Sequence, residues 1–392
     1  MDKSTWFNLC FEMMLDYIPE NFTVSETTEK FRSVITHIEA ISEYLYAAKT
    51  NLDDNVAKYF SLAGVGHKEI SNYDTALKYY LMSVSIRTQN NNEKALALVY
   101  NNIAVVYNIM AEREKAIEYY NKSIDISRKY NEPPMNLAIS YNNLANVYLC
   151  SYAYNEAFEW NESALALIEN HSLTDNPLCV DIYLTKSTIH YVNENFEEAL
   201  KIDFAALDLL RKHFQEEHSD IGTVYNCIAR EYFSLKQYPI ALEYYFKAHR
   251  IFGKVYGDDD SDTAEVCGSI ARTYTLMEEY ELALEWYSKA LEAQRHSLGD
   301  NHPEVMLRHS FMSDIYEKME LYSEAIKHLQ VAFNFFVRKK YFVPLYDLCN
   351  RIADNYEHIC NYSESAKFRE MATESKNTAP ALKEIEFNGN QL

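Results

Sequence analysis

Uncharged amide side chains recur along this 392-residue sequence, and they are the residues best suited to binding a ligand by hydrogen bonds. A carboxamide offers a hydrogen-bond donor and an acceptor at once, which suits bonding to a main chain. Two arginines at equivalent positions of neighbouring segments suit pairing with a carboxylate. We predict that these residues contact a ligand: Asn101, Asn102, Asn142, Asn143, Asn146, Asn226, Arg230 and Arg272.

Motifs that would indicate catalysis or metal binding are missing from the sequence. It contains no P-loop, H-E-x-x-H, G-x-S-x-G or dinucleotide fingerprint. Gly64 and Gly66 form a lone G-x-G, which we interpret as close helix packing. The acidic run at 258–262 lacks the spacing of an EF-hand loop and is interpreted as a turn. His67 and His190 are expected to be core residues. We therefore predict no enzymatic activity, no metal and no cofactor.

Composition limits the compartment and the partners. The 37 basic and 58 acidic residues give a net charge of −21, which disfavours nucleic acid or an anionic membrane as a direct partner. Seven cysteines without a C-x-x-C pair are typical of reduced thiols in an intracellular protein. No run of about 18 uncharged residues is present. We predict a cytoplasmic protein.

The elements that must position these side chains follow from a repeated pattern. An aromatic residue is followed by an apolar residue at the third position, a small residue at the fourth, tyrosine at the seventh, and alanine nine residues later. Tyr100, Ile103, Ala104, Tyr107 and Ala116 show one copy. The final marker recurs in steps of 40 to 42 residues, at Ala76, Ala116, Ala157, Ala199, Ala241, Ala283, Ala325 and Ser365.

Each copy predicts two antiparallel amphipathic helices. Markers at i, i+3, i+4 and i+7 form one stripe of a helix, and the alanine begins the equivalent stripe of a second helix. One such hairpin cannot bury its own apolar faces, so successive hairpins must stack. With only 8 Gly and 8 Pro, the chain favours long helices, and several of these residues fall in the turns between copies.

The offsets resemble those of the tetratricopeptide repeat (TPR) family, in the long variety of about 42 residues that kinesin light chains contain. A single inter-helix segment supports the likeness to the long variety, namely Leu298, Gly299, Asn301, His302, Pro303 and Val305. The resemblance implies an all-α, right-handed superhelical solenoid of about eight helix-turn-helix units with a helical N-terminal cap. The expected domains are a cap or half-repeat at 1–56, the solenoid at 57–375 and a flexible tail at 376–392. The cap should contain helices near 4–18 and 26–49.

The face of each first helix opposite the packing stripe carries the amides. A face left to bulk water would be rich in Glu and Lys, whereas Asn101, Asn102, Asn142 and Asn143 are uncharged. In TPR proteins this face is the concave peptide-binding groove, so the resemblance implies that Asn102 and Asn143 bond to a peptide backbone. The alternative is that these asparagines are repeat consensus residues that hold water.

Charged residues vary along the same face. The basic set of the carboxylate-clamp TPRs is not matched, which disfavours a chaperone C-terminus as the ligand. Later units carry acids on this face, and we expect an acidic C-terminal end of the groove, formed by Asp314, Glu317, Asp347 and Asp354.

Two functional hypotheses follow. The first is a non-enzymatic scaffold or adaptor that binds a peptide segment of a partner protein in the concave groove. The alternative is a peptide-sensing regulator similar to the TPR pheromone receptors of bacteria. A prenyl- or glycan-transferring solenoid is a minor enzymatic possibility. We also expect that the terminal helices can form a homodimer contact.

Overall fold

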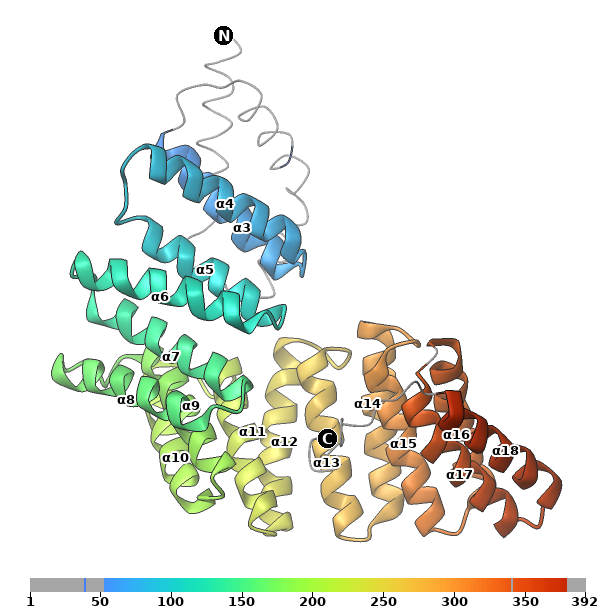
Figure 1. Cartoon of the computed structure of the whole chain (residues 1–392). Coiled ribbons are helices and arrows are strands. Elements are labelled where there is room, and N and C mark those ends of the chain that lie inside the picture. Colours follow the sequence, from blue (N-terminus) through green and yellow to red (C-terminus); the bar gives the residue numbers. More distant parts are fainter. Residues whose placement is uncertain (1–38, 40–52, 340, 379–392) are drawn as a thin grey trace, which may run out of the picture. The chain divides into compact units, whose positions relative to one another are not determined.

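The computed structural model describes residues 39, 53–339 and 341–378, and these residues form helices joined by short turns, with no strand among them. Figure 1 shows the helices succeeding one another as antiparallel pairs. The first four pairs are α3 (Asp54–Glu69) with α4 (Tyr73–Gln89), α5 (Leu96–Ile109) with α6 (Arg113–Lys129), α7 (Pro134–Cys150) with α8 (Tyr154–Asn170), and α9 (Val180–Val192) with α10 (Phe196–His213). A 3-10 turn, Pro177–Cys179, precedes α9.

The remaining four pairs continue the same order. They are α11 (Ser219–Ser234) with α12 (Tyr238–Val255), α13 (Ser261–Leu276) with α14 (Tyr280–Leu298), α15 (Pro303–Lys318) with α16 (Tyr322–Lys339), and α17 (Phe342–His358) with α18 (Tyr362–Thr378). The prediction of an all-α solenoid of eight helix-turn-helix units is confirmed for the described residues.

The chain divides into two compact units, 1–209 and 210–392. Unit 1 contains the hairpins from α3 to α9 and most of α10, and unit 2 contains those from α11 to α18. The domain bounds expected from the sequence remain predictions. The expected helices near 4–18 and 26–49 lie outside the described residues except for Glu39, which is helical. The helix α18 continues to Thr378, and the rest of the expected tail lies outside.

The marker residues lie where the two helices of a hairpin cross. All seven marker alanines have 0% exposure, and Ser365 has 3%. A small side chain at this point lets the two backbones approach, and the aromatic residues then fill the gaps around it. Tyr120, Tyr225 and Tyr287 are each at most 3% exposed. In unit 2, Ala271, Ala283 and Tyr287 pack with Met312 and Ile315 of the next hairpin in one apolar cluster.

Every hairpin turn uses a residue in the left-handed region five positions before the marker. In the turn between α11 and α12, Lys236 has φ 59°, and the Gln237 amide donates to the Tyr232 carbonyl at 2.9 Å. This geometry satisfies orphan carbonyls at the helix end. The eight residues are Ser71, Ala111, Tyr152, Glu194, Lys236, Glu278, Glu320 and Cys360. Glycine with positive φ occurs instead between hairpins of unit 2, at Gly257 and Gly299.

In the part of the chain that the structure describes, no helix combines the length and the apolar character needed to cross a membrane.

We expect a larger residue at a marker position to destabilise unit 2. Replacing Ala283 with Leu forces methyl groups into a site with 0% exposure, which should lower the free energy of unfolding by roughly 1–3 kcal/mol. Chemical denaturation measures the change. Ala366→Leu is the matched control, because Ala366 is exposed on α18 and should tolerate leucine. Equal effects of both substitutions would contradict the assignment of Ala283 to the crossing point.

Candidate functional site

Two of the predicted amides in unit 1 contact each other on neighbouring first helices. Asn143 on α7 donates from Nδ2 to Oδ1 of Asn101 on α5, at 3.4 Å, and both side chains are partly buried. Their positions 42 residues apart place them in register along the stack. Asn102 is also partly buried. Asn101 lines a groove of about 560 Å³ together with Leu98 and Ile139.

Asn142 lies away from this wall. It is 2% exposed, and its Oδ1 accepts a hydrogen bond from Nδ2 of Asn161 on α8, at 3.1 Å. The same Asn161 nitrogen donates to the Ile182 carbonyl at 3.0 Å, so the pair joins α7, α8 and α9. Asn142 therefore links helices in the core, and we leave it out of the candidate site.

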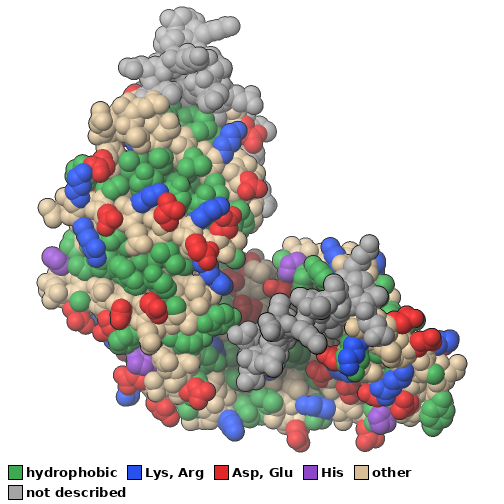
Figure 2. Space-filling view, in the orientation of Figure 1, with side chains coloured by type: hydrophobic (Ala, Val, Ile, Leu, Met, Phe, Trp, Pro, Cys, Tyr) green, Lys and Arg blue, Asp and Glu red, His purple; other side chains and the backbone are tan. Residues whose placement is uncertain are grey.

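Asn146 has a partner on the next hairpin. Its Oδ1 accepts from the Thr185 hydroxyl of α9 at 3.1 Å. In unit 2, Asn226 on α11 is partly buried. Figure 2 shows acidic, basic and hydrophobic side chains interspersed on the visible face of the molecule, without one dominant charge.

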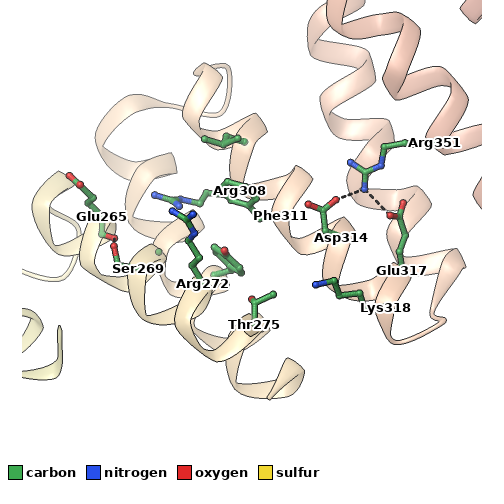
Figure 3. Close-up of a pocket in the computed structure, with 13 residues that line it drawn as sticks. Glu265, Ser269, Arg272, Thr275, Arg308, Phe311, Asp314, Glu317, Lys318 and Arg351 are labelled. Carbon is green, nitrogen blue, oxygen red and sulfur yellow. Dashed lines mark hydrogen bonds and ion pairs between the residues drawn. The ribbon is translucent and has the colours of Figure 1, made fainter. Parts of the chain in front are cut away.

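A larger groove lies in unit 2, on the faces of three successive first helices. Its volume is about 790 Å³, and Figure 3 shows its lining. The helix α13 contributes Glu265, Gly268, Ser269, Arg272 and Thr275, α14 contributes Tyr287, α15 contributes Leu307, Arg308, Phe311, Asp314, Glu317 and Lys318, and α17 contributes Arg351. Of the predicted residues, Arg272 lines this groove.

Arg272 is exposed and lies over the Phe233 ring of α11, with its Cζ 5.0 Å from the ring centroid. Such a contact holds the guanidinium in place without neutralising it. Arg230, one repeat earlier, donates from Nη2 to Oε1 of Glu231 at 3.1 Å, and Glu231 has 0% exposure. The two predicted arginines thus differ, because Arg230 is engaged by a buried carboxylate.

Arg308 is a cation of the groove that the sequence analysis missed. Its Nε donates to Oε1 of Gln294 at 3.1 Å, and Gln294 is 2% exposed. Burial lowers the pKa of Arg308, while Tyr287, Glu304 and Glu265 oppose that effect. The guanidinium lies against Gly268, where a β-carbon would be 2.7 Å from Arg308 Cζ.

The acids at the far end of the groove are paired. Arg351 donates to Asp314 and to Oε2 of Glu317 at 2.9 Å (Figure 3). It also donates to the Ser313 hydroxyl at 3.1 Å. Asn355 adds a hydrogen bond to Oε1 of Glu317 at 2.6 Å. Of the four acids expected at this end, Asp314 and Glu317 thus share the single cation of Arg351, Asp354 pairs with Arg369, and Asp347 is exposed.

The same network sets the electrostatics of this end. Partial burial raises the pKa of Asp314 above its ordinary value, and Arg351 only partly offsets that effect. Burial by itself would lower the pKa of Arg351, but Asp314 and Glu317 raise it. Each charge therefore depends on the other.

Two signals in the sequence point to the missed residues. Arg351 occupies the same offset as Asn102 and Asn143, two residues after the aromatic position. Gly268 lies in the middle of a helix, where glycine costs about 1 kcal/mol relative to alanine and so indicates a close approach. No motif in the sequence marks Arg308 itself.

The acidic run at 258–262 caps a helix. Oδ1 of Asp260 accepts from the Asp262 amide at 2.8 Å, at the start of α13. Within residues 39, 53–339 and 341–378, no group of three or more His, Cys, Asp or Glu side chains is arranged to hold a metal ion.

Comparison with known proteins identifies the repeat. The tetratricopeptide repeat family matches residues 55–129, 95–170, 220–295 and 268–336. The unmatched stretch between 170 and 220 contains α9 and α10, the weakest copy of the pattern. No curated protein sequence matches the chain. Repeats of this family form extended surfaces for binding other proteins.

Solved structures share the fold at low sequence identity. A STAND signal-transduction ATPase with a tetratricopeptide repeat sensor, PH0952 from Pyrococcus horikoshii, has a TM-score of 0.60 at 16% identity, over 93% of this chain and 55% of that one. The apo form of RapI has a TM-score of 0.54 at 15% identity, over 90% of this chain and 97% of that one. A Rap protein complexed with competence and sporulation factor has a TM-score of 0.54 at 16% identity, over the same 90% and 97%.

We expect Arg351→Met to destabilise the chain in a pH-dependent way. Near pH 7 it leaves Asp314 and Glu317 charged and without their cation, which should cost about 1–2 kcal/mol after allowance for their partial exposure. The raised pKa of Asp314 means that the folded state binds this proton more tightly than the unfolded state, so the deficit should shrink as the pH falls and Asp314 becomes neutral.

Denaturant titrations of wild type and variant at about pH 7 and about pH 4.5 measure the two deficits. Arg338→Met is the control, since Arg338 is exposed on α16 and, within the part of the chain that the structure describes, donates only to the Asn334 carbonyl of its own helix. A deficit for Arg351→Met that stays constant between the two pH values would contradict the pairing.

Proposed function

The chain belongs to the tetratricopeptide repeat family, and on that premise we propose that it is a non-enzymatic adaptor that binds an extended segment of a partner protein in the groove of unit 2. The observation that carries the proposal is the groove itself. Its lining combines Leu307 and Phe311 with three cationic side chains, Arg272, Arg308 and Lys318. An apolar strip beside a few polar groups is the usual composition of a ligand site.

The dimensions favour a segment of chain over a small metabolite. The lining comes from three consecutive first helices, so a ligand must be elongated to contact all of them. A strand-like peptide alternates its side chains between two sides, and can place one on Phe311 while another meets a cation. The sequence contains no catalytic motif, which agrees with a groove that binds its ligand without transforming it.

The amide wall of unit 1 is a second proposed contact surface. We infer that Asn101, Asn102 and Asn143 present donors and acceptors for a main chain, with Asn146 at the edge. The bond between Asn143 and Asn101 supports this role, because it orients both amides along the first-helix face. Asn226 and Arg230 would play the corresponding part on α11 of unit 2.

A specific likeness favours a second candidate, a peptide-sensing regulator. The two Rap structures match this chain over 90% of its length and 97% of theirs, and one of them is complexed with competence and sporulation factor. For this chain, such a role would mean that a short peptide in the groove changes its conformation. Small-angle scattering with and without a bound peptide separates the candidates, since compaction favours a sensor and an unchanged curve favours an adaptor.

We expect a bulky residue in the unit 2 groove to abolish peptide binding. Nonapeptides selected by display on the full chain serve as probes, and calorimetry measures their affinity. Ser269→Trp should weaken them by about tenfold or more by occupying the groove, because Ser269 lines it and is partly exposed. Arg338→Met, on a second helix, should leave the affinity unchanged.

The helical circular dichroism of Ser269→Trp must match that of wild type for the comparison to hold. Selected peptides that bind this variant as tightly as wild type would place their site elsewhere and overturn the proposal.

A further inference from the structure

Three cations in the unit 2 groove lack an ion pair among the residues that the structure describes, although acids outnumber bases in the chain by 58 to 37. Neither Arg272, Arg308 nor Lys318 forms an ion pair with any residue in the described ranges. Elsewhere in unit 2 the cations of the first-helix faces are satisfied, as Arg351 is by Asp314 and Glu317. The groove thus carries positive charges that no acidic side chain of the described residues pairs with.

A hydrogen bond at one edge of the guanidinium holds Arg308 in position. Its Nε donates to Gln294, whose own Nε2 is fixed by Oε2 of Glu304 at 3.1 Å. This bond uses one of the five N–H donors, and the terminal nitrogens make no hydrogen bond with the described part of the chain. A partly buried guanidinium with open donors is complementary to a carboxylate, which can accept two of them side by side.

Gly268 provides the space for this guanidinium. The glycine lies in the interior of α13 and is buried, so neither a turn nor a positive φ requires it. A β-carbon there would lie 2.7 Å from Arg308 Cζ and 2.8 Å from Nη2. Any side chain at 268 would therefore push the guanidinium from its place.

The charges of Arg272 and Arg308 both act on Tyr287 in the groove. Burial raises the pKa of Tyr287 to about 12, and both arginines oppose that effect through their charges. The Tyr287 ring also stacks on Phe311, with centroids 5.6 Å apart. In Figure 3 the guanidinium groups of Arg272 and Arg308 lie at the same end of the groove, next to Phe311.

The groove's own acids leave these donors open. Asp314 and Glu317 bond to Arg351 at the other end. Glu265, on the rim, is exposed and makes no ion pair within the described residues, although Arg308 and Arg230 both act on its carboxylate.

We propose that the unit 2 groove recognises an acidic peptide, whose carboxylate binds between Arg308 and Arg272 while a neighbouring apolar side chain packs on Leu307 and Phe311. The inference rests on the proposed function and names the chemistry of its ligand. Gly268 is then a positioning residue, which keeps Arg308 where a carboxylate can reach it. The carboxylate belongs either to an Asp or Glu side chain or to a peptide C-terminus, and both have the same recognition chemistry.

The test uses pools of fluorescein-labelled random nonapeptides, with fluorescence anisotropy on the full chain as the readout. One pool has Glu fixed at the centre and an amidated C-terminus, the second has Gln at the centre and an amidated C-terminus, and the third has Gln and a free C-terminus. Wild type should bind one of the two carboxylate-bearing pools about tenfold more tightly than the second pool. Which pool gains identifies the source of the carboxylate.

Two variants attribute the preference to the groove. Arg272→Gln removes an exposed cation, and Gly268→Ala displaces Arg308 without changing the net charge. Each should reduce the preference to about threefold or less. Arg338→Met removes the same charge outside the groove and should retain it. Thermal melts and circular dichroism verify that Gly268→Ala remains folded, and Arg272→Gln provides the result independently if it does not.

The possible results distinguish a failure of the carboxylate preference from a failure of the proposed peptide binding. Equal binding of all three pools would overturn the carboxylate preference and leave peptide binding standing. A preference that survives in both groove variants would also overturn it. No binding of any pool, together with failure of the display selection, would instead overturn the proposed function.

Discussion

The structure depends on one constraint, which is that a single helical hairpin cannot bury both of its apolar faces. A small residue at each crossing point, alanine in seven hairpins and Ser365 in the eighth, brings the two helices close, and the tyrosines around it then need the next hairpin to cover them. Stacking therefore follows from the sequence period and not from any special contact. Because packing uses one stripe of every first helix, much of the opposite stripe is left available for binding, although Asn142 lies in the core.

That free stripe differs between the two units. In unit 1 it carries amides that bond to one another along the stack, such as Asn143 with Asn101. In unit 2 it carries charges, and Asp314 and Glu317 are paired with Arg351, whereas Arg272 and Arg308 form no ion pair with the described residues. A strongly acidic protein can thus offer a locally cationic groove, because Arg351 removes two carboxylates from competition for Arg272 and Arg308. Net charge alone would have hidden this feature.

The sequence predicts the fold well because the repeat pattern occurs eight times, and every copy indicates the same helical hairpin. It predicts the site less well, since periodicity gives the face of a helix but not what a neighbouring hairpin does there. Asn142 shares the local pattern of Asn101, yet Asn161 on α8 draws it into the core. Arg308 has no counterpart in the other copies, and only the close approach of Gly268 reveals it. Asp314 and Arg351 lie on two different hairpins, so the pattern of a single repeat cannot predict that they pair.

Hydrogen–deuterium exchange with and without a bound nonapeptide tests the central claim most directly, which is that the first-helix face of unit 2 is the binding surface. The account predicts slower exchange in α13 and α15, over the stretches 265–275 and 307–318 that line the groove. Exchange in the second helices α14 and α16 should change less, apart from the region around Tyr287. Protection confined to second helices, or to unit 1 alone, would contradict the account.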